Sequence, residues 1–268
     1  MIKYSDDFDT LDAETVKPLE GNISPEAINA QVNAVLSDVG VPPEIDGPTD
    51  CVVNLPSGQS ALVRELTGDD EEALAKIDRN THTTKFMATL LQRGVEELND
   101  EPVTAKDLKN LLLGDREALI LGIRIATFGK KIELYDLICP GENCGVLLDI
   151  DIDVSTIPIE PIVEDRFKVN LWKGGIVEVR LPNGFDQEEV FNRDKTSAEQ
   201  NTILLSRCIQ GYSLTDVKKL GVKDRRNILT AIVEHTGGPQ YGKVTFTHED
   251  CGTEVPVVIT AGHLFQDL

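Results

Sequence analysis

Two short segments of the chain carry residue types that bind transition metals. The first is Cys139-Pro140-Gly141-Glu142-Asn143-Cys144-Gly145 and the second is His248-Glu249-Asp250-Cys251-Gly252. Zinc takes four nitrogen or sulfur ligands in a tetrahedron, and a turn of this kind supplies two of them while glycine permits the turn. Cys139, Cys144, His248 and Cys251 would close such a site and leave no position for a catalytic water. The pattern therefore predicts a structural zinc site.

Three other interpretations of these cysteines stay open at the level of sequence. Cys139 and Cys144 could form a disulfide, the thiols could be unrelated and reduced, or the site could have lost its metal. The first segment is a zinc-ribbon knuckle, Cys-Pro-x-x-Cys-Gly, with two extra residues in its loop, and the second has His where Cys is usual. Five cysteines is an odd number, which argues against a secreted disulfide framework.

Other motifs give little support for catalysis. Gly237–Lys243 approaches a phosphate-binding loop, but Val244 has no hydroxyl for magnesium and the loop is expected between a helix and a strand. Asp149, Asp151 and Asp153 alternate with apolar residues, which is typical of a strand with one solvated face. The sequence has neither Gly-x-Ser-x-Gly nor His-Glu-x-x-His. We therefore expect no enzyme and no small-molecule substrate.

The charge and hydropathy of the chain narrow the classes of partner. Lys and Arg total 26 against 46 Asp and Glu, which gives a formal charge of −20 and disfavours nucleic acid and anionic membranes. The longest apolar runs are far shorter than the roughly 20 residues that cross a bilayer, and the first residues do not resemble a signal peptide. We expect neither a nucleic-acid nor a membrane partner, and a chain that stays in the cytosol where it is made.

Several segments recur in the same order, which predicts an internal duplication. Residues 107–123 match residues 216–232 at a constant offset of 109, and in both copies Asp-Arg opens a helix with one apolar face. Residues 51–58 match 177–184, each as a strand that ends in a Pro-x-Gly turn, and the helical segment 90–95 matches 204–209. Strand pairs follow at 131–138 with 146–154 and at 243–247 with 254–259, and each encloses one knuckle.

The predicted architecture is α+β, with two related halves. Each half is expected to hold a β-hairpin, helices and a zinc-ribbon-like knuckle hairpin. The expected division is an extended acidic arm over residues 1–50, a first repeat over 51–155 and a second repeat over 156–268. Because equivalent knuckles of two facing repeats would meet, the duplication explains how pairs of ligands 103 residues apart could share one metal.

The segment from Leu111 to Gly129, with its Gly114-Asp115-Arg116 helix start, leads through Tyr135 into the first knuckle. Together with Leu55-Pro56-Ser57-Gly58 and Val63–Gly68, it resembles the baseplate-hub and hub-assembly protein family of T-even-type contractile-tailed bacteriophages. The resemblance covers residues 51–150 well and the second half weakly. The knuckle loop is longer than the family's, and residues 1–50 have no match.

The resemblance implies a non-enzymatic structural or assembly protein of a phage tail baseplate or hub. It would act through contacts with other tail and baseplate proteins, in the virion tail baseplate and in the host cytoplasm during assembly. The alternative is a cytosolic zinc-ribbon regulatory or nucleic-acid-binding module, which the charge of −20 disfavours.

Overall fold

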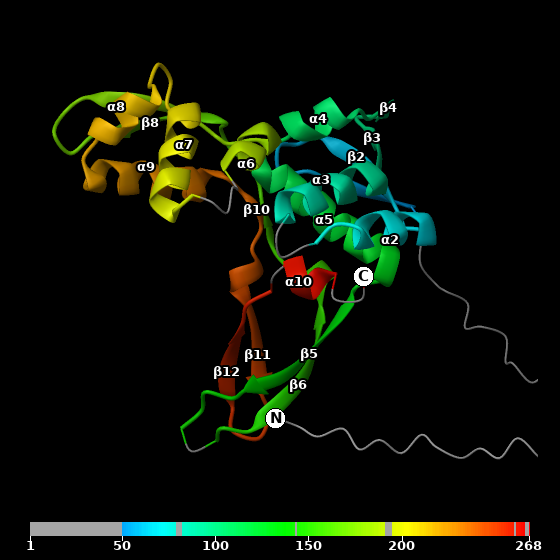
Figure 1. Cartoon of the computed structure of the whole chain (residues 1–268). Coiled ribbons are helices and arrows are strands. Elements are labelled where there is room, and N and C mark those ends of the chain that lie inside the picture. The colour runs from blue at the N-terminus through cyan, green and yellow to red at the C-terminus, as the bar shows by residue number, and fades with distance from the viewer. Residues whose placement is uncertain (1–49, 79–81, 143, 191–194, 260, 266–267) are drawn as a thin grey trace, which may run out of the picture. The chain divides into compact units, whose positions relative to one another are not determined.

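A computed structural model describes residues 50–78, 82–142, 144–190, 195–259, 261–265 and 268. The expected arm over residues 1–50 lies outside this range except for its last residue. The described residues form one compact unit. The predicted α+β class is confirmed, because helices alternate with small antiparallel sheets (Figure 1). Within the described residues, no helix is long and apolar enough to cross a membrane.

The first part of the unit is a four-stranded antiparallel sheet with helices against it. Its strands follow in the order β1 (Asp50–Asn54), β2 (Ser60–Arg64), β3 (Val95–Leu98) and β4 (Glu101–Pro102). Helices α2 (Gly68–Ala75) and α3 (Thr83–Gly94) connect β2 to β3. Helices α4 (Ala105–Asn110) and α5 (Leu113–Phe128) follow, and α5 packs on β1 and β2.

The second part consists of a hairpin followed by four helices. Its hairpin is β8 (Arg166–Asn170) with β9 (Ile176–Arg180). Its helices are α6 (Gly184–Val190), α7 (Ser197–Cys208), α8 (Leu214–Lys219) and α9 (Val222–His235). Two short strands flank this part. Strand β7 (Ile159–Glu160) precedes it, β10 (Gly238–Pro239) follows it, and the two strands pair with each other. Single 3-10 turns lie at Val154–Thr156 and Tyr241–Lys243.

Both predicted knuckle hairpins are present and lie beside each other (Figure 1). The first is β5 (Lys131–Ile138) with β6 (Leu147–Asp153), and the second is β11 (Val244–His248) with β12 (Thr253–Val257). In β6 the aspartates are exposed and Ile150 and Ile152 are buried, so the predicted one-sided strand is confirmed. Alternation of this kind fixes which strand face enters the core.

Two hydrophobic clusters stabilise the compact unit. One spans residues 162–232 and joins β8 and β9 to α7, α8 and α9. The other joins residues 51–157 to the end of the chain, where Val257, Ile259, Leu264 and Phe265 are almost fully buried. Helix α10 (Ala261–Leu264) packs on β5. The C-terminal hairpin and α10 therefore pack on the first part of the chain, while the expected division at residues 155 and 156 stays a prediction about sequence repeats.

Two details of the predicted elements were wrong. Residues 177–184 do not form a strand followed by a hairpin turn, because Gly184 begins α6, whereas Pro56-Ser57-Gly58 does turn between β1 and β2. By order and pairing, β9 corresponds to β2 and not to β1. Helix α5 was expected to bury one face, but residues 118–124 are all buried, since the sheet, β10 and the α3 and α6 helices surround it. Helix α9 does show the predicted single buried face.

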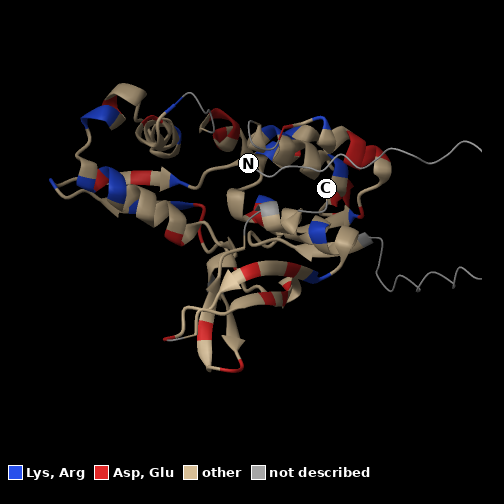
Figure 2. Ribbon diagram, turned by 60° about the horizontal axis from the view of Figure 1, so that its bottom comes forward, with Lys and Arg blue, Asp and Glu red and all other residues tan. Residues whose placement is uncertain are grey.

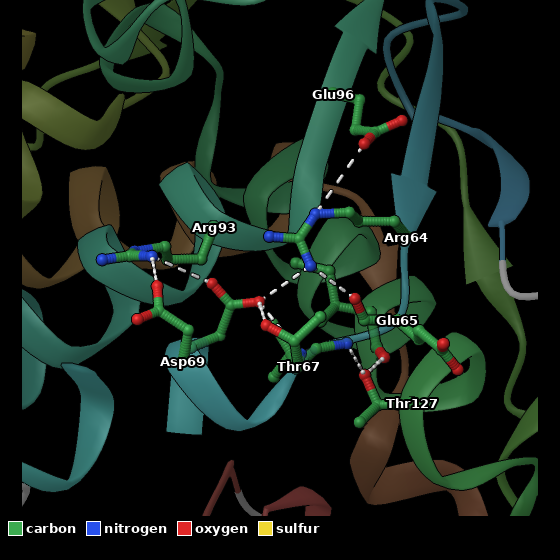
Figure 3. A network of polar contacts seen from close by, with 10 residues as sticks. Arg64, Glu65, Thr67, Asp69, Arg93, Glu96 and Thr127 are labelled. Atoms are coloured by element: carbon green, nitrogen blue, oxygen red, sulfur yellow. Dashed lines mark hydrogen bonds and ion pairs between the residues drawn. The ribbon is translucent and has the colours of Figure 1, made fainter. Parts of the chain in front are cut away.

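A buried aspartate ties the hairpin to the helices in the first part of the chain. Asp70, 1% exposed, accepts hydrogen bonds from Arg64 Nη1 (2.8 Å), Arg93 Nη1 (3.2 Å) and the Thr67 backbone N–H (2.9 Å). Figure 3 shows Arg64 reaching from β2 and Arg93 from α3 to the start of α2, where Thr67 and Asp69 lie. The network satisfies a carboxylate that would otherwise be costly to bury.

An equivalent network holds the second part. Asp186, 0% exposed, accepts from Arg180 Nη1 (2.6 Å) and Nη2 (2.9 Å), Arg207 Nε (2.6 Å) and the Asn183 N–H (3.0 Å). Arg180 lies at the end of β9 and Arg207 on α7, as Arg64 and Arg93 lie on β2 and α3. Burial alone would raise the pKa of Asp186, but the hydrogen bonds from Arg180, Asn183 and Arg207 lower it below its usual range.

A second pair of aspartates ties each hairpin turn to a long helix. Asp115 in the first turn of α5 accepts from the Ser57 N–H at 2.9 Å, and Asp224 in the first turn of α9 accepts from the Trp172 N–H at 2.5 Å. Ser57 and Trp172 each lie in the turn of their hairpin. The same kind of contact therefore recurs at the same place in both parts.

Candidate metal centre

The four predicted ligands lie at the ends of the two knuckle hairpins. Cys139 follows β5 and its N–H donates to the Val146 carbonyl at 3.0 Å, which continues the hairpin past Ile138. Cys144 lies in the turn back to β6. His248 ends β11, and the turn that contains Cys251 closes when the Gly252 N–H donates to the His248 carbonyl at 2.8 Å. Each turn is thus built by local backbone bonds.

Glycine is required in both turns. Gly145 and Gly252, directly after the second predicted ligand of each knuckle, have φ of 62° and 67°, the left-handed region that other residues adopt at a cost. Gly141 has no room for a side chain, since a Cβ would lie 2.6 Å from Thr253 Oγ1 and 3.2 Å from Cys251 Sγ. The glycines allow the two hairpin ends to approach closely.

The ligand atoms have the spacing of a tetrahedral zinc site. The three sulfurs and the histidine nitrogen all lie within 4.8 Å of one another. Cys139 Sγ is 3.6 Å from Cys251 Sγ, and His248 Nδ1 is 3.5 Å from Cys144 Sγ and 3.2 Å from Cys251 Sγ. Zinc–sulfur and zinc–nitrogen bonds in a regular tetrahedron place two sulfurs about 3.8 Å apart and a sulfur and a nitrogen about 3.6 Å apart. The donor set therefore fits zinc and could hold a metal ion.

The surroundings of these atoms favour metal-binding forms. Cys139 and His248 are buried, and Cys251 is exposed. Hydrogen bonds from the side chain and backbone of Thr253 lower the pKa of the Cys251 thiol to about 6, which favours the thiolate that metals bind. His248 Nε2 lies 3.5 Å from Asp250 Oδ2, on the ring side opposite Nδ1. A carboxylate at this place orients a metal-binding imidazole.

The glycine-rich segment that approaches a phosphate-binding loop lies between α9 and β11. Gly238 has φ of 92°, and a Cβ there would lie 2.9 Å from the Gly114 Cα, so the glycine-rich segment is packed against α5. It runs from α9 through β10 to β11, the helix-to-strand order expected from sequence. All five cysteines are free, so the structure contains no disulfide between Cys139 and Cys144.

Charge on the two knuckle hairpins is mainly acidic. Figure 2 shows Asp and Glu along these strands and few Lys or Arg. Lys131 is an exception and pairs with Asp151 at 2.7 Å and Glu133 at 3.6 Å. A zinc-ribbon surface that binds phosphate would be expected to show the opposite balance.

Sequence reasoning did not identify the two buried aspartate networks. The signal was present, since Arg64 and Asp70 have the spacing of Arg180 and Asp186, and a glycine precedes each aspartate by two positions. Arg93 and Arg207 were matched as helix residues without a partner. The sequence alone does not indicate which of the two adjacent aspartates is buried. The side chain of Asp69 is 82% exposed, whereas that of Asp70 is 1% exposed.

Comparison with known proteins gives one match. A family model described as T4 bacteriophage base plate protein matches residues 49–212. Searches of curated proteins and of solved structures give no significant match.

Proposed function

We propose a function that starts from family membership: this chain belongs to the T4 bacteriophage base plate protein family and is a structural protein of a phage tail baseplate. The match to residues 49–212 carries this conclusion. Within the baseplate, we assign the chain to the hub or to its assembly, as a non-enzymatic protein that binds other tail proteins. The residues that resemble hub proteins, from Leu111 into the first knuckle, support this finer assignment.

The two parts of the chain are copies of one unit in this proposal. Both contain a hairpin, four helices and a knuckle hairpin in this order, and the first part has the additional strands β3 and β4 between its second and third helices. Asp70 and Asp186 bind equivalent arginines, and Asp115 and Asp224 bind equivalent hairpin turns. The expected ranges 51–155 and 156–268 describe these copies, and the acidic arm over 1–50 precedes them. Duplication accounts for these three matching contacts, which a chance recurrence of apolar residues would not produce.

Zinc bound by Cys139, Cys144, His248 and Cys251 is the structural cofactor of this proposal. It would hold the C-terminal hairpin against β5 and β6, and thereby fix Val257 and Phe265 in the first hydrophobic cluster. Four protein ligands leave no open coordination position, so the metal would supply stability and no chemistry on a substrate. Loss of a structural zinc can cost on the order of 10 kcal/mol in small domains.

Partners in this proposal are proteins of the tail and baseplate, with no nucleic acid, membrane or small-molecule substrate. The acidic surface supports the first of these exclusions. The competing assignment, a zinc-ribbon regulatory or nucleic-acid-binding module, is not favoured by the family match. Salt-dependent binding of DNA or RNA by the purified chain would favour it instead.

The test of function is a phage in which this gene carries a stop codon. We expect host lysates that lack complete baseplates, and restoration when the wild-type chain is supplied from a plasmid. A tagged chain should cross-link to hub proteins in preference to the surrounding wedge proteins. Normal tails from the defective phage would refute the baseplate function, while cross-links confined to wedge proteins would refute only the hub assignment. Mass spectrometry of purified virions tells whether the chain is retained.

The test of the metal is elemental analysis of the purified chain. We expect one zinc per chain, lost in Cys251→Ser and in His248→Ala. Cys208→Ser is the matched control, because Cys208 is buried in the other cluster and should retain the metal. A wild-type chain that contains no metal and whose melting temperature does not respond to chelator would refute the zinc site.

A further inference from the structure

Helix α6 of the second part covers a surface of the first part through close contacts. A Cβ on Gly184 would lie 2.7 Å from Arg116 Nη1 and 3.0 Å from the Lys109 Cα, so only glycine fits there. Lys109 Nζ pairs with Glu188 Oε2 at 2.9 Å, and Arg116 Nε donates to Gln187 Oε1 at 3.2 Å. Arg116 is almost fully buried at this surface, with 3% of it exposed, whereas the Lys109 and Glu188 side chains are 30% and 34% exposed.

Backbone hydrogen bonds add to the same contact. The Leu113 N–H at the start of α5 donates to the Pro182 carbonyl, and the Gly184 N–H donates to the Leu111 carbonyl, both at 3.2 Å. The segment before α6 is therefore held by backbone hydrogen bonds to the residues between α4 and α5, in addition to the side-chain pairs.

The second part has the corresponding surface, and it is open in the described structure. Lys218, Val222 and Arg225 stand at an offset of 109 from Lys109, Leu113 and Arg116. Val222 is 84% exposed and Lys218 is exposed, while Arg225 is partly buried against Ala198, whose carbonyl accepts from Nη2 at 3.0 Å. A pocket forms here, lined by Ala198, Asn201, Val222, Arg225, Arg226 and Leu229.

The first part has the element that would fill this pocket. Gly68, Glu71 and Glu72 on α2 stand at an offset of 116 from Gly184, Gln187 and Glu188 on α6. All three are exposed. Their charge is opposite to that of Lys218 and Arg225, and the pairing Glu72 with Lys218 would reproduce Glu188 with Lys109. The pairing of Glu71 with Arg225 would be an ion pair, where the equivalent Gln187 and Arg116 form a hydrogen bond between an amide and a guanidinium.

Gly68 has no evident role within the chain. Its φ is not in the positive region that favours glycine, and a Cβ at this position would meet nothing within 4 Å. At the equivalent position, Gly184 is required by the guanidinium and backbone pressed against it. Glycine at 68 therefore points to a close neighbour at α2.

We propose that a second copy of this chain places α2, with Gly68, Glu71 and Glu72, on the open surface formed by Lys218, Val222 and Arg225. The contact joins different surfaces of the two copies, so it is heterologous and leaves one of each surface open for further copies. The proposal rests on the equivalence of the two parts given above. It concerns self-association of the purified chain and needs no other tail protein.

Sedimentation velocity of the full chain over a range up to on the order of 100 μM tests the proposal, since small transient interfaces are weak. We expect the mean mass to rise with concentration. Lys218→Glu and Glu72→Lys should each weaken association about tenfold or more, because like charges then face each other across the contact. An equimolar mixture of the two variants should recover association, because the intact α2 of one meets the intact Lys218 surface of the other.

Gly68→Leu separates association from folding. We expect a melting temperature equal to or above that of the wild type, with association abolished, because the side chain has room in one copy and none at the contact. Gly242→Leu is the matched control, since Gly242 also has open space and no positive φ but lies outside α2. A wild-type chain that stays monomeric would overturn the proposal, as would Gly68→Leu that associates normally or a variant mixture that stays monomeric. None of these results alters the test of the baseplate function, which is made on phage tails.

Discussion

Replacing the carboxylate of Asp70 by an amide tests whether the buried network stabilises the first part of the chain. Burial alone would raise the pKa of Asp70, but hydrogen bonds from Arg64 and Thr67 lower it from 3.8 to about 2. Asp70→Asn keeps the size of the side chain and removes its charge, which leaves Arg64 and Arg93 facing a neutral amide. Breaking a buried ion pair from one side costs about 3 kcal/mol or more, and we expect a loss of this size at pH 6.

The pH dependence gives a second, independent magnitude. A carboxyl group with a pKa of 3.8 in the unfolded chain and about 2 in the folded chain contributes about 2 kcal/mol of stability above pH 4. This contribution falls as pH falls from about 4 toward 2, and roughly half remains at pH 3. Asn does not titrate. The difference between wild type and Asp70→Asn should therefore shrink by about 1 kcal/mol from pH 6 to pH 3.

Urea unfolding followed by circular dichroism at both pH values measures these differences, with chelator present so that metal binding does not contribute. Asp69→Asn is the control on the same helix, since Asp69 is 82% exposed and pairs with Arg93 at 2.9 Å. We expect it to change stability by less than about 1 kcal/mol at either pH. An Asp70→Asn difference that is the same at pH 6 and pH 3, or no larger than that of Asp69→Asn, would refute the reasoning.

Three further predictions concern other buried groups. Asp186→Asn should lower the free energy of unfolding by about 3 kcal/mol at neutral pH, measured by urea unfolding, and less in acid because hydrogen bonds from Arg180 and Arg207 lower the pKa of Asp186. Burial raises the pKa of Cys208 to about 12, so iodoacetamide at pH 8 should leave Cys208 unlabelled in the native chain and label it in urea, as read by peptide mass spectrometry; labelling of the native chain would contradict its burial. Gly238→Ala should lower stability by about 2 kcal/mol or more, because φ is 92° and the Cβ would lie 2.9 Å from the Gly114 Cα, and an unchanged melting temperature would show that β10 can move away from α5.

Local patterns predicted much of the fold and the candidate site. The alternation in β6 and the cysteine turns predicted both knuckle hairpins, and the predicted ends of their strands differ from the observed ends by two residues or fewer. Strand faces and tight turns depend on neighbouring residues, so a local pattern can predict them. The pairing of Cys139 and Cys144 with His248 and Cys251 came from the recurrence of segments, and the structure brings the four side chains together. Whether they bind zinc stays a prediction.

Longer-range features were not available from local patterns. Residues 177–184 have the same letters as a strand and hairpin turn, but Asp186 and its two arginines make Gly184 a helix start. Residues 118–124 of α5 are buried on all sides because β10 and α6, which lie more than 50 positions later in the chain, pack on this helix. Hydrophobic periodicity indicates which face of a helix is buried, but it does not predict which elements distant in the sequence pack on the other faces.

The antiparallel pair of β7 with β10 has a consequence for the order in which the chain can fold. The chain leaves the first hydrophobic cluster after Ile157 and returns to it at Tyr241, and just inside these points Ile159 and Pro239 pair directly opposite each other. The residues between β7 and β10 are therefore an insertion into a unit that is completed only by residues 241–268. During synthesis from the N-terminus, the inserted part has all of its own cluster before the interrupted part does. The part encoded later can therefore fold first, while α5 and β5 wait for Val257, Leu264 and Phe265 to leave the ribosome.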